Sequence, residues 1–465
     1  MLKLKSKDTQ VAKKLYIKTY GCQMNVYDSE RIAEVLAPIG FVLSDTSDDA
    51  DMVILNTCHI REKAAEKVYS ELGRLRKQKA TKEKAGGRMI LGVTGCVAQA
   101  EGAEVLKRAP YVDLVFGPQT YHRLPEMVAR AVRQHGQVLD TDFPEDNKFD
   151  SLPSTRTVEG ATAFLTVQEG CDKFCTYCVV PYTRGAEYSR PVGQVLKEAQ
   201  ALVRAGAVEI TVLGQNVNAY HGTGTDGEEW GLAQLIREIA AIKGLDRIRY
   251  ITSYPAEMTD ELIEAHADIA KLMPYLHLPI QSGADSVLKA MNRQHTVAHY
   301  KTIVQKLRKA VPDIALSSDF IVGFPGETDA DFEETLKLVE EIQFIQTYSF
   351  KYSARPGTPA ALLDSQDEYH VPEAVKATRL ARLQAALNGN TLAFNLGAVG
   401  QTYPVLLERL GKTPGYLVGR SPYMQTVVVA APEHFLHTIQ NVLMTQAGPN
   451  SLQGELVNSA QRATA

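Results

Sequence analysis

The chain has 465 residues, of which 45% are hydrophobic and 22% are charged, an ordinary composition for a globular protein of about two to four domains. Its formal charge of −4, from 50 basic and 54 acidic residues, excludes a polycation that wraps nucleic acid. No apolar run approaches the roughly 20 residues that span a bilayer, and the lysine-rich N-terminus lacks the apolar stretch of a secretory signal, so we expect a cytoplasmic protein with no membrane partner.

Up to about residue 138, strand-like and helix-like segments alternate, and a cysteine follows each of three strands. The strands are Leu15–Tyr20, Met52–Leu55 and Met89–Val93, and the cysteines that follow them are Cys22, Cys58 and Cys96. Because the carboxyl ends of parallel strands line one edge of a sheet, these thiols are expected to converge in an α/β domain. The alternative is three unrelated buried thiols, since free cysteine is among the most buried residue types.

The alternation stops at residues 139–159, which we interpret as a linker. From residue 160 to residue 396, six strand-like runs alternate with helical stretches such as Gln194–Ala205 and Asp329–Gln343. The runs are Ala163–Val167, Glu209–Leu213, Arg247–Thr252, Tyr275–Pro279, Ala315–Val322 and Thr347–Tyr352. Six βα units without eight predict a partial (β/α)6 barrel of the TIM type, with its functional groups at the C-terminal ends of the strands.

The last part of the chain is rich in strands and turns. After a helix near Pro372–Asn395, four short strands are predicted: Val399–Glu408, Tyr416–Gly419, Val427–Ala430 and Ser451–Leu456. They indicate a small β-barrel over residues 397–459.

The chain has six cysteines, and those outside the N-terminal set form the tight cluster Cys171, Cys175 and Cys178. Soft thiolates select iron–sulfur clusters or zinc. A structural zinc site needs a fourth ligand, and its cysteines usually come as two separated CxxC pairs, so zinc is the weaker alternative. Three thiolates on a cubane cluster leave one iron without a protein ligand. Each set of three therefore predicts one reactive cluster.

The spacing CxxxCxxC, with Tyr177 before the third cysteine, resembles the radical S-adenosylmethionine (SAM) superfamily. In that superfamily the open iron chelates the methionine part of SAM, and one electron cleaves a sulfonium bond to leave a 5′-deoxyadenosyl radical. Further blocks resemble the methylthiotransferases, in particular those that modify tRNA. These blocks are Thr19–Asn25, Asn56–Ala64, Gly95–Gln99, Gly170–Pro191, Leu213–Tyr220, His277–Gly283 and Ile321–Thr328.

The resemblance implies an N-terminal methylthiotransferase domain over residues 14–138, a radical SAM barrel over residues 160–396 and a C-terminal TRAM domain. It implies two [4Fe–4S] clusters, one on Cys22, Cys58 and Cys96 and a catalytic one on Cys171, Cys175 and Cys178. It also implies SAM as a cofactor, for which the candidate binding residues are Tyr177, Gly214, Gln215, Gln281, Ser282 and Gly323. Glycine permits close backbone approach to such a ligand, although a lone glycine is more often an ordinary turn.

The implied reaction inserts a methylthio group at carbon two of N(6)-isopentenyladenosine next to the anticodon of tRNA. The barrel cluster would generate the radical, and the N-terminal cluster would present the methylated sulfur. The implied partners are the anticodon stem-loop of tRNA carrying isopentenyladenosine, an electron donor such as flavodoxin or ferredoxin, and a sulfur or cluster donor. The alternatives are a sister methylthiotransferase that acts on threonylcarbamoyladenosine in tRNA or on a ribosomal-protein aspartate, and a non-catalytic iron–sulfur RNA-binding protein.

Two segments bear on RNA binding. The C-terminal segment resembles a TRAM domain, a small β-barrel that binds RNA, but its charges balance, which leaves Tyr423 as a candidate stacking surface. From Arg61 to Arg88, ten basic residues stand against four glutamates. This excess fits a solvated helix face and a phosphate-binding face equally well.

Overall fold

A computed structural model describes residues 12–58, 64–134 and 136–457 of the chain. Contacts divide the chain into two compact units. The N-terminal unit contains the chain up to Thr157 together with Val180–Gly185, and the barrel unit contains Val158–Val179 and the chain from Ala186 onward.

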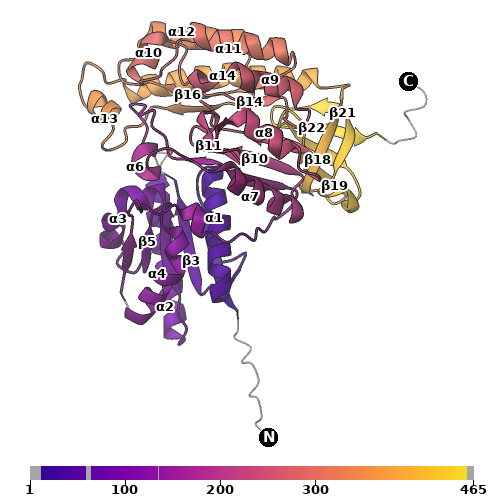
Figure 1. The fold of residues 1–465 in the computed structure, drawn as a ribbon. Helices are drawn as coiled ribbons and strands as arrows, with labels where there is room; N and C mark the ends of the chain where they lie inside the picture. Colours follow the sequence, from indigo (N-terminus) through magenta and orange to yellow (C-terminus); the bar gives the residue numbers. More distant parts are fainter. Residues whose placement is uncertain (1–11, 59–63, 135, 458–465) are drawn as a thin grey trace. The chain divides into compact units, whose positions relative to one another are not determined.

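The N-terminal unit is built on one parallel six-stranded sheet in the order β2-β1-β3-β4-β5-β6, of which Figure 1 labels β3 and β5. Its strands are β1 (Lys13–Thr19), β2 (Phe41–Leu43), β3 (Met52–Thr57), β4 (Ile90–Gly95), β5 (Leu114–Phe116) and β6 (Val138–Asp140). Its helices are α1 (Gln23–Leu36), α2 (Ala64–Lys84), α3 (Cys96–Arg108), α4 (Leu124–Gln134), α5 (Lys148–Ser151) and α6 (Val180–Arg184). The three predicted strands are confirmed; the added strands β2, β5 and β6 have three residues each and are too short to show a clear pattern.

The two faces of this sheet bury separate hydrophobic clusters. Ile54 packs with side chains of α1 and α4, whereas its neighbours Val53 and Leu55 pack with side chains of α2 and α3. Every residue of β3 and β4 is buried. Continuous burial of this kind is typical of parallel strands that are covered by helices on both faces.

Part of the predicted linker is folded against the N-terminal unit. Arg156 pairs with Glu34 at 3.0 Å and with Glu30 at 3.1 Å, and Arg31 pairs with Glu34 as well. The side chains of Arg156 and Glu34 are 1% and 7% exposed. Because a buried pair broken on one side costs about 3–5 kcal/mol, these contacts hold the segment on α1.

The basic residues of α2 are largely engaged within the N-terminal unit. Lys79 pairs with Asp113 at 2.5 Å, Lys82 pairs with Asp51 at 2.7 Å, and Arg74 pairs with Glu71. Lys77 and Lys84 are exposed on the same helix. The structure thus favours a solvated face with internal ion pairs for most of the described segment, while Arg61 and Lys63 lie outside the described residues.

The barrel unit contains the predicted partial barrel (Figure 1). Its central strands are β7 (Thr162–Thr166), β10 (Glu209–Leu213), β13 (Arg247–Tyr250), β14 (Tyr275–His277), β15 (Ala315–Ser317), β16 (Asp319–Val322) and β17 (Tyr348–Lys351). Parallel pairing joins β13-β10-β7, β14-β15 and β16-β17. All six predicted runs are confirmed, with the fifth interrupted at Ser318.

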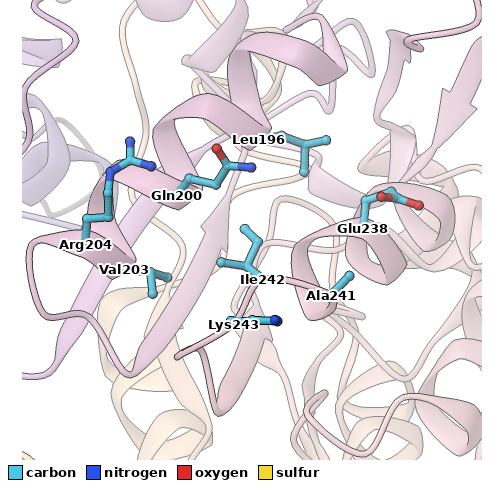
Figure 2. A pocket seen from close by; sticks show the side chains of 8 residues that line it. All are labelled: Leu196, Gln200, Val203, Arg204, Glu238, Ala241, Ile242 and Lys243. Atoms are coloured by element: carbon cyan, nitrogen blue, oxygen red, sulfur yellow. The ribbon is translucent and has the colours of Figure 1, made fainter.

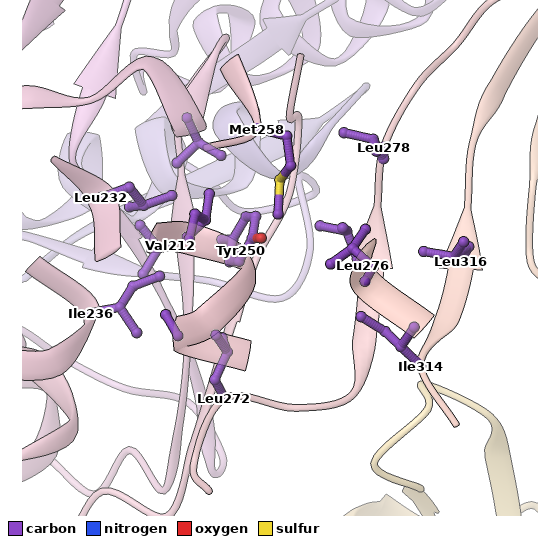
Figure 3. Close-up of a cluster of buried hydrophobic side chains, with 14 of the residues drawn as sticks. Val212, Leu232, Ile236, Tyr250, Met258, Leu272, Leu276, Leu278, Ile314 and Leu316 are labelled. Carbon is purple, nitrogen blue, oxygen red and sulfur yellow. The ribbon is translucent and has the colours of Figure 1, made fainter. Parts of the chain in front are cut away.

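Helices cover the strands of this barrel. They are α7 (Val192–Arg204), α8 (Leu232–Ala240), α9 (Asp260–Asp268), α10 (Asp285–Ala290), α11 (Val297–Ala310), α12 (Asp329–Ile342), α13 (Pro359–Asp364) and α14 (Glu373–Gly397). Short strands pair in two antiparallel two-stranded sheets: β8 (Gln168–Glu169) with β9 (Tyr188–Ser189), and β11 (His221–Thr223) with β12 (Glu229–Gly231). Figure 3 shows Val212, Tyr250, Leu276 and Leu316, from β10, β13, β14 and β15, in one buried cluster. None of the described helices is both long and apolar enough to cross a membrane.

The chain ends in a closed barrel in the order β18-β19-β20-β22-β21. Its strands are β18 (Thr402–Leu410), β19 (Tyr416–Arg420), β20 (Thr426–Ala430), β21 (Ile439–Ala447) and β22 (Leu452–Leu456). The strand β21 was not predicted, because Gln440, Asn441 and Gln446 interrupt its apolar pattern. Only Val442 and Met444 of β21 are buried in the small core.

Two buried arginines of β13 attach the small barrel to the larger one. Arg249 donates to the carbonyls of Ser421 and Pro422, at 3.1 and 2.8 Å, and pairs with the buried Glu209. Arg247 donates to the carbonyls of Pro404 and Arg420. The small barrel is therefore part of the same compact unit as the larger barrel.

Tyr423 has a packing role at this attachment, and its stacking role stays a prediction. Its ring lies edge-on to Phe394 and Tyr403, with centroids 5.8 and 5.4 Å apart, and its hydroxyl donates to Asp313. Arg420 is paired with Glu408, which further reduces the free positive charge of the small barrel.

A buried histidine gives the barrel unit a pH-dependent stability. His266 on α9 is 6% exposed and contacts the Tyr250 hydroxyl at 2.7 Å. Burial lowers the pKa of His266 from 6.5 to about 4. The unfolded chain therefore binds one more proton than the folded chain between these values, and stability present above pH 6.5 is lost as the pH falls toward 4.

We expect His266→Gln to flatten this dependence by about 1.4 kcal/mol per pH unit between pH 6.5 and 4. The measurement is the free energy of unfolding from urea titrations at several pH values in that window. Comparing slopes removes any constant effect of the substitution. The control is His434→Gln, which removes an exposed histidine outside the barrel core. Equal slopes for wild type and His266→Gln would contradict the prediction.

Candidate active site

Cys22, Cys58 and Cys96 lie at the carboxyl ends of three neighbouring strands, β1, β3 and β4. Cys22 is the N-cap of α1, Cys58 directly follows β3, and Cys96 is the first residue of α3. The Cys58 thiol hydrogen bonds to Cys22, and the charge of Cys22 acts on Cys96. The structure therefore brings together the three thiols that the strand pattern predicted to converge.

Two glycines make this convergence possible. Gly21 has a φ of +121°, and a Cβ atom at this position would collide with the Cys58 side chain. Gly95 has a φ of +87°, and a Cβ atom there would collide with the carbonyl of Thr57. A residue with a side chain at either position would force the strand ends apart.

Buried amides hold the same loops. Asn25 donates to the Asn56 side chain at 2.9 Å, and Asn56 donates back to the Asn25 carbonyl at 2.8 Å. Both side chains are fully buried. They lie in the sequence blocks around Cys22 and Cys58, but nothing in the sequence pattern assigned them this positioning role.

Arg184 supplies a positive charge beside the N-terminal thiols. It belongs to α6, which packs in the N-terminal unit, and it pairs with Asp28 of α1 at 2.6 Å. The hydrogen bond from Cys58 lowers the pKa of Cys22 to about 6, and the Arg184 charge acts in the same direction. Burial raises the pKa of Cys96, and the charge of Arg184 partly opposes this rise. The site thus favours the thiolate, the form that binds metal, at Cys22.

Cys171, Cys175 and Cys178 lie in one loop of the barrel unit, after β7 and β8. The loop turns sharply, with φ of +80° at Gly170 and +47° at Phe174, and the Cys178 amide donates to the Cys175 carbonyl at 2.9 Å. Cys175 is 9% exposed and the other two are half-buried. The chain passes from Cys178 through Val179 directly into α6.

The loop after β10 is tied to the start of the cysteine loop. The Gln215 side chain accepts from the Gly170 amide at 2.6 Å. Gln168 is fully buried; it donates to the Gly170 carbonyl and accepts from the Asn216 amide. A Cβ atom at Gly214 would lie 2.5 Å from the Gln168 side chain, so close packing explains this glycine.

The remaining predicted SAM residues make contacts within the barrel unit. The Tyr177 ring lies edge-on to Phe324 at 6.5 Å, and burial raises the pKa of its hydroxyl. Gln281 has a φ of +81° and pairs through its backbone with Asp319 and Ile321.

Ser282 and Gly323 are explained by packing. The Ser282 hydroxyl accepts from the Ala284 amide at 3.2 Å. A Cβ atom at Gly323 would collide with the Lys376 side chain of α14. The absence of a side chain at Gly323 therefore lets α14 pack closely against this loop. A role of either residue toward SAM stays a prediction.

Comparisons with known proteins identify the chain. A family described as uncharacterized protein family UPF0004 matches residues 14–117, the radical SAM superfamily matches residues 165–339, and the TRAM domain matches residues 398–457. A tRNA-2-methylthio-N(6)-dimethylallyladenosine synthase from Maricaulis maris is 58% identical over 455 residues, which cover 97% of this chain and 99% of that protein. The chain belongs to this synthase family.

Solved structures show the same fold at low identity. The radical SAM methyltransferase TsrM from Kitasatospora setae, with cobalamin and a [4Fe–4S] cluster bound, has a TM-score of 0.55 at 13% identity, covering 75% of this chain and 77% of its own. The cobalamin-dependent radical SAM enzyme OxsB has a TM-score of 0.51 at 15% identity, covering 76% of this chain and 55% of its own. Both likenesses concern the fold alone.

Two buried polar side chains follow the carboxyl ends of strands in the barrel unit of this synthase-family chain. Asn216 follows β10 and is 1% exposed, and Ser253 follows β13 and is 5% exposed. The Asn216 amide group and the Ser253 hydroxyl have no hydrogen-bond partner in the described chain. Buried polar groups of this kind are costly unless a ligand or water satisfies them. Ser253 had not been singled out in the sequence.

Cluster binding is compatible with the thiol arrangement. Among the described residues, no group of three or more His, Cys, Asp or Glu side chains is arranged to hold a single metal ion. A cubane takes each thiolate on a different iron, so its three ligands do not meet at one point.

Two hollows lie away from the cysteines. The first, of about 390 Å³, lies between α7 and α8 and is lined by Leu196, Gln200, Val203, Arg204, Glu238, Ala241, Ile242 and Lys243 (Figure 2). The second, of about 300 Å³, lies between α14 and the small barrel and includes Asn388, Asn395 and Arg420. Neither is lined by a residue predicted to bind SAM or iron.

Proposed function

We propose that this chain inserts a methylthio group at carbon two of N(6)-isopentenyladenosine next to the anticodon of tRNA. The observation that carries the proposal is the match to a named tRNA-2-methylthio-N(6)-dimethylallyladenosine synthase along almost the whole of both chains. The chain has two sets of three cysteines, one at the ends of three parallel strands and one in a single loop of the barrel unit, and two such sets supply the ligands that this reaction needs.

The proposal includes two [4Fe–4S] clusters. Cys171, Cys175 and Cys178 would hold the cluster that, with SAM bound, supplies the radical chemistry. Cys22, Cys58 and Cys96 would hold a second cluster that supplies the sulfur. Gln168 and Gln215 fix the loops around the first set, and Asn216 and Ser253 present the polar atoms that would hold the methionine part of SAM.

The proposed substrate is the anticodon stem-loop of tRNA that carries isopentenyladenosine. An unpaired loop base leaves its stack at lower cost than a base in a duplex, so the target carbon can reach a buried site. An electron donor such as flavodoxin or ferredoxin, a sulfur or cluster donor, and a cytoplasmic location complete the proposal.

Mass analysis of tRNA nucleosides from a strain that lacks this protein tests the substrate. We expect the methylthio-isopentenyl nucleoside to disappear and isopentenyladenosine to accumulate, with wild-type protein restoring the product. The methylthio derivative of threonylcarbamoyladenosine should stay unchanged. Persistence of the methylthio-isopentenyl nucleoside, with no second enzyme present, would defeat the assignment.

A further inference from the structure

The turn after α10 clamps the three-cysteine loop of the barrel unit. The Thr176 amide donates to the Met291 carbonyl at 3.1 Å, and the Thr176 hydroxyl donates to the Ala290 carbonyl at 2.9 Å. The Asn292 side chain donates to the carbonyls of Lys173 and Phe174, at 3.2 and 3.1 Å. These bonds hold both peptide groups that flank the left-handed residue Phe174.

Arg293 extends from this turn to the most buried cysteine of the loop. Its Nη1 donates to the Sγ of Cys175 over 3.8 Å, and its Nη2 donates to the Pro279 carbonyl at 2.6 Å. Its guanidinium carbon lies 4.2 Å from the centroid of the Tyr254 ring. Three separate contacts therefore fix the orientation of this group.

Tyr254 is itself held in place, so the guanidinium rests on a rigid support. The Tyr254 amide donates to the Asn218 side chain at 2.7 Å, and its hydroxyl accepts from the Gln294 amide at 2.7 Å. Lys173 of the cysteine loop pairs with Glu257 and lies 5.5 Å from the same ring. Arg293 is thus a cation with a fixed orientation whose donor contacts a cysteine sulfur of this loop.

We propose that Arg293 is a positioning residue that orients Cys175 and raises the reduction potential of the cluster bound by this loop. A guanidinium keeps its positive charge at all working pH values. Hydrogen bonds and charge near ligand sulfurs set the potentials of iron–sulfur clusters. Because reduction adds one negative charge to the cluster, a fixed positive charge at Cys175 stabilises the reduced form. This inference rests on the proposed function for the presence of the cluster.

The test is a potentiometric titration of anaerobic, full-length holoprotein, followed by electron paramagnetic resonance. The barrel signal is identified as the one that Cys175→Ala removes. We expect Arg293→Met and Arg293→Gln to lower the ratio of reduced to oxidised cluster about tenfold at a fixed potential, which is 59 mV for a one-electron couple. Arg293→Lys keeps the charge and should restore most of the wild-type ratio.

The matched control is Arg308→Met, which removes a half-buried arginine that donates to the Ile342 carbonyl far along α11. It should leave the potential unchanged. Loss of barrel iron in the Met and Gln variants but not in the Lys variant would also support the proposal. Equal potentials in wild type and Arg293→Met, or loss of iron in the Lys variant as well, would overturn it. Since neither tRNA nor SAM is present, such a failure leaves the substrate assignment untouched.

Discussion

Replacing Cys175 by alanine should abolish SAM cleavage while iron remains at the N-terminal thiols. Cys175 is the most buried cysteine of its loop and accepts from Arg293, so its loss removes one ligand and leaves a buried cation without its sulfur partner. The two sets of thiols lie in different compact units, which is the reason to expect independent loading.

The measurement for Cys175→Ala is the yield of 5′-deoxyadenosine from reduced, reconstituted protein, together with iron and sulfide counts. The control is Phe174→Asn in the same loop, because Phe174 is 53% exposed and asparagine tolerates its φ of +47°. This control should keep both iron and SAM cleavage. If Cys175→Ala emptied both sets of thiols of iron, the picture of two independent clusters would be wrong.

Replacing Cys58 by alanine should have the opposite effect: SAM cleavage persists, but no methylthio product forms. Cys58 is 3% exposed, donates to Cys22 and packs against Gly21, so its removal takes away one ligand and the hydrogen bond that lowers the pKa of Cys22. The barrel loop contains none of these contacts and should retain its iron.

The measurement for Cys58→Ala is again the iron count, together with separate assays of 5′-deoxyadenosine and of methylthio-nucleoside in tRNA. The control is Val26→Ala, a change at an exposed position one turn along α1 from Cys22. It should behave as wild type. Formation of methylthio product by Cys58→Ala would rule out the N-terminal thiols as the site of sulfur supply.

The local pattern of the chain determined the largest features of the fold. Strand, cysteine and helix recur three times in the first part, and parallel strands place such residues at one edge whatever their separation in sequence. The adjacency of Cys22, Cys58 and Cys96 followed from this rule. The six barrel strands followed from short strand-like runs that alternate with helical stretches, a pattern that is local in the sequence.

The local hydrophobic pattern of the sequence did not predict every element of the fold. The strand β21 carries polar residues at four of its nine positions, because a small barrel buries only one side of each strand. The segment Val180–Gly185 belongs to the N-terminal unit although it follows the barrel cysteines directly, and only three-dimensional packing assigns it there.

The environment of the thiols was decided by tertiary structure. Arg293 reaches Cys175 across 118 positions of sequence, and Arg184 reaches Asp28 across 156. The contacts of Tyr423 with Phe394, Tyr403 and Asp313 likewise join residues that are distant in sequence. Metal-ligand spacing is a local property that a sequence displays, whereas the charge and burial around the ligands come from residues that only the folded chain brings together.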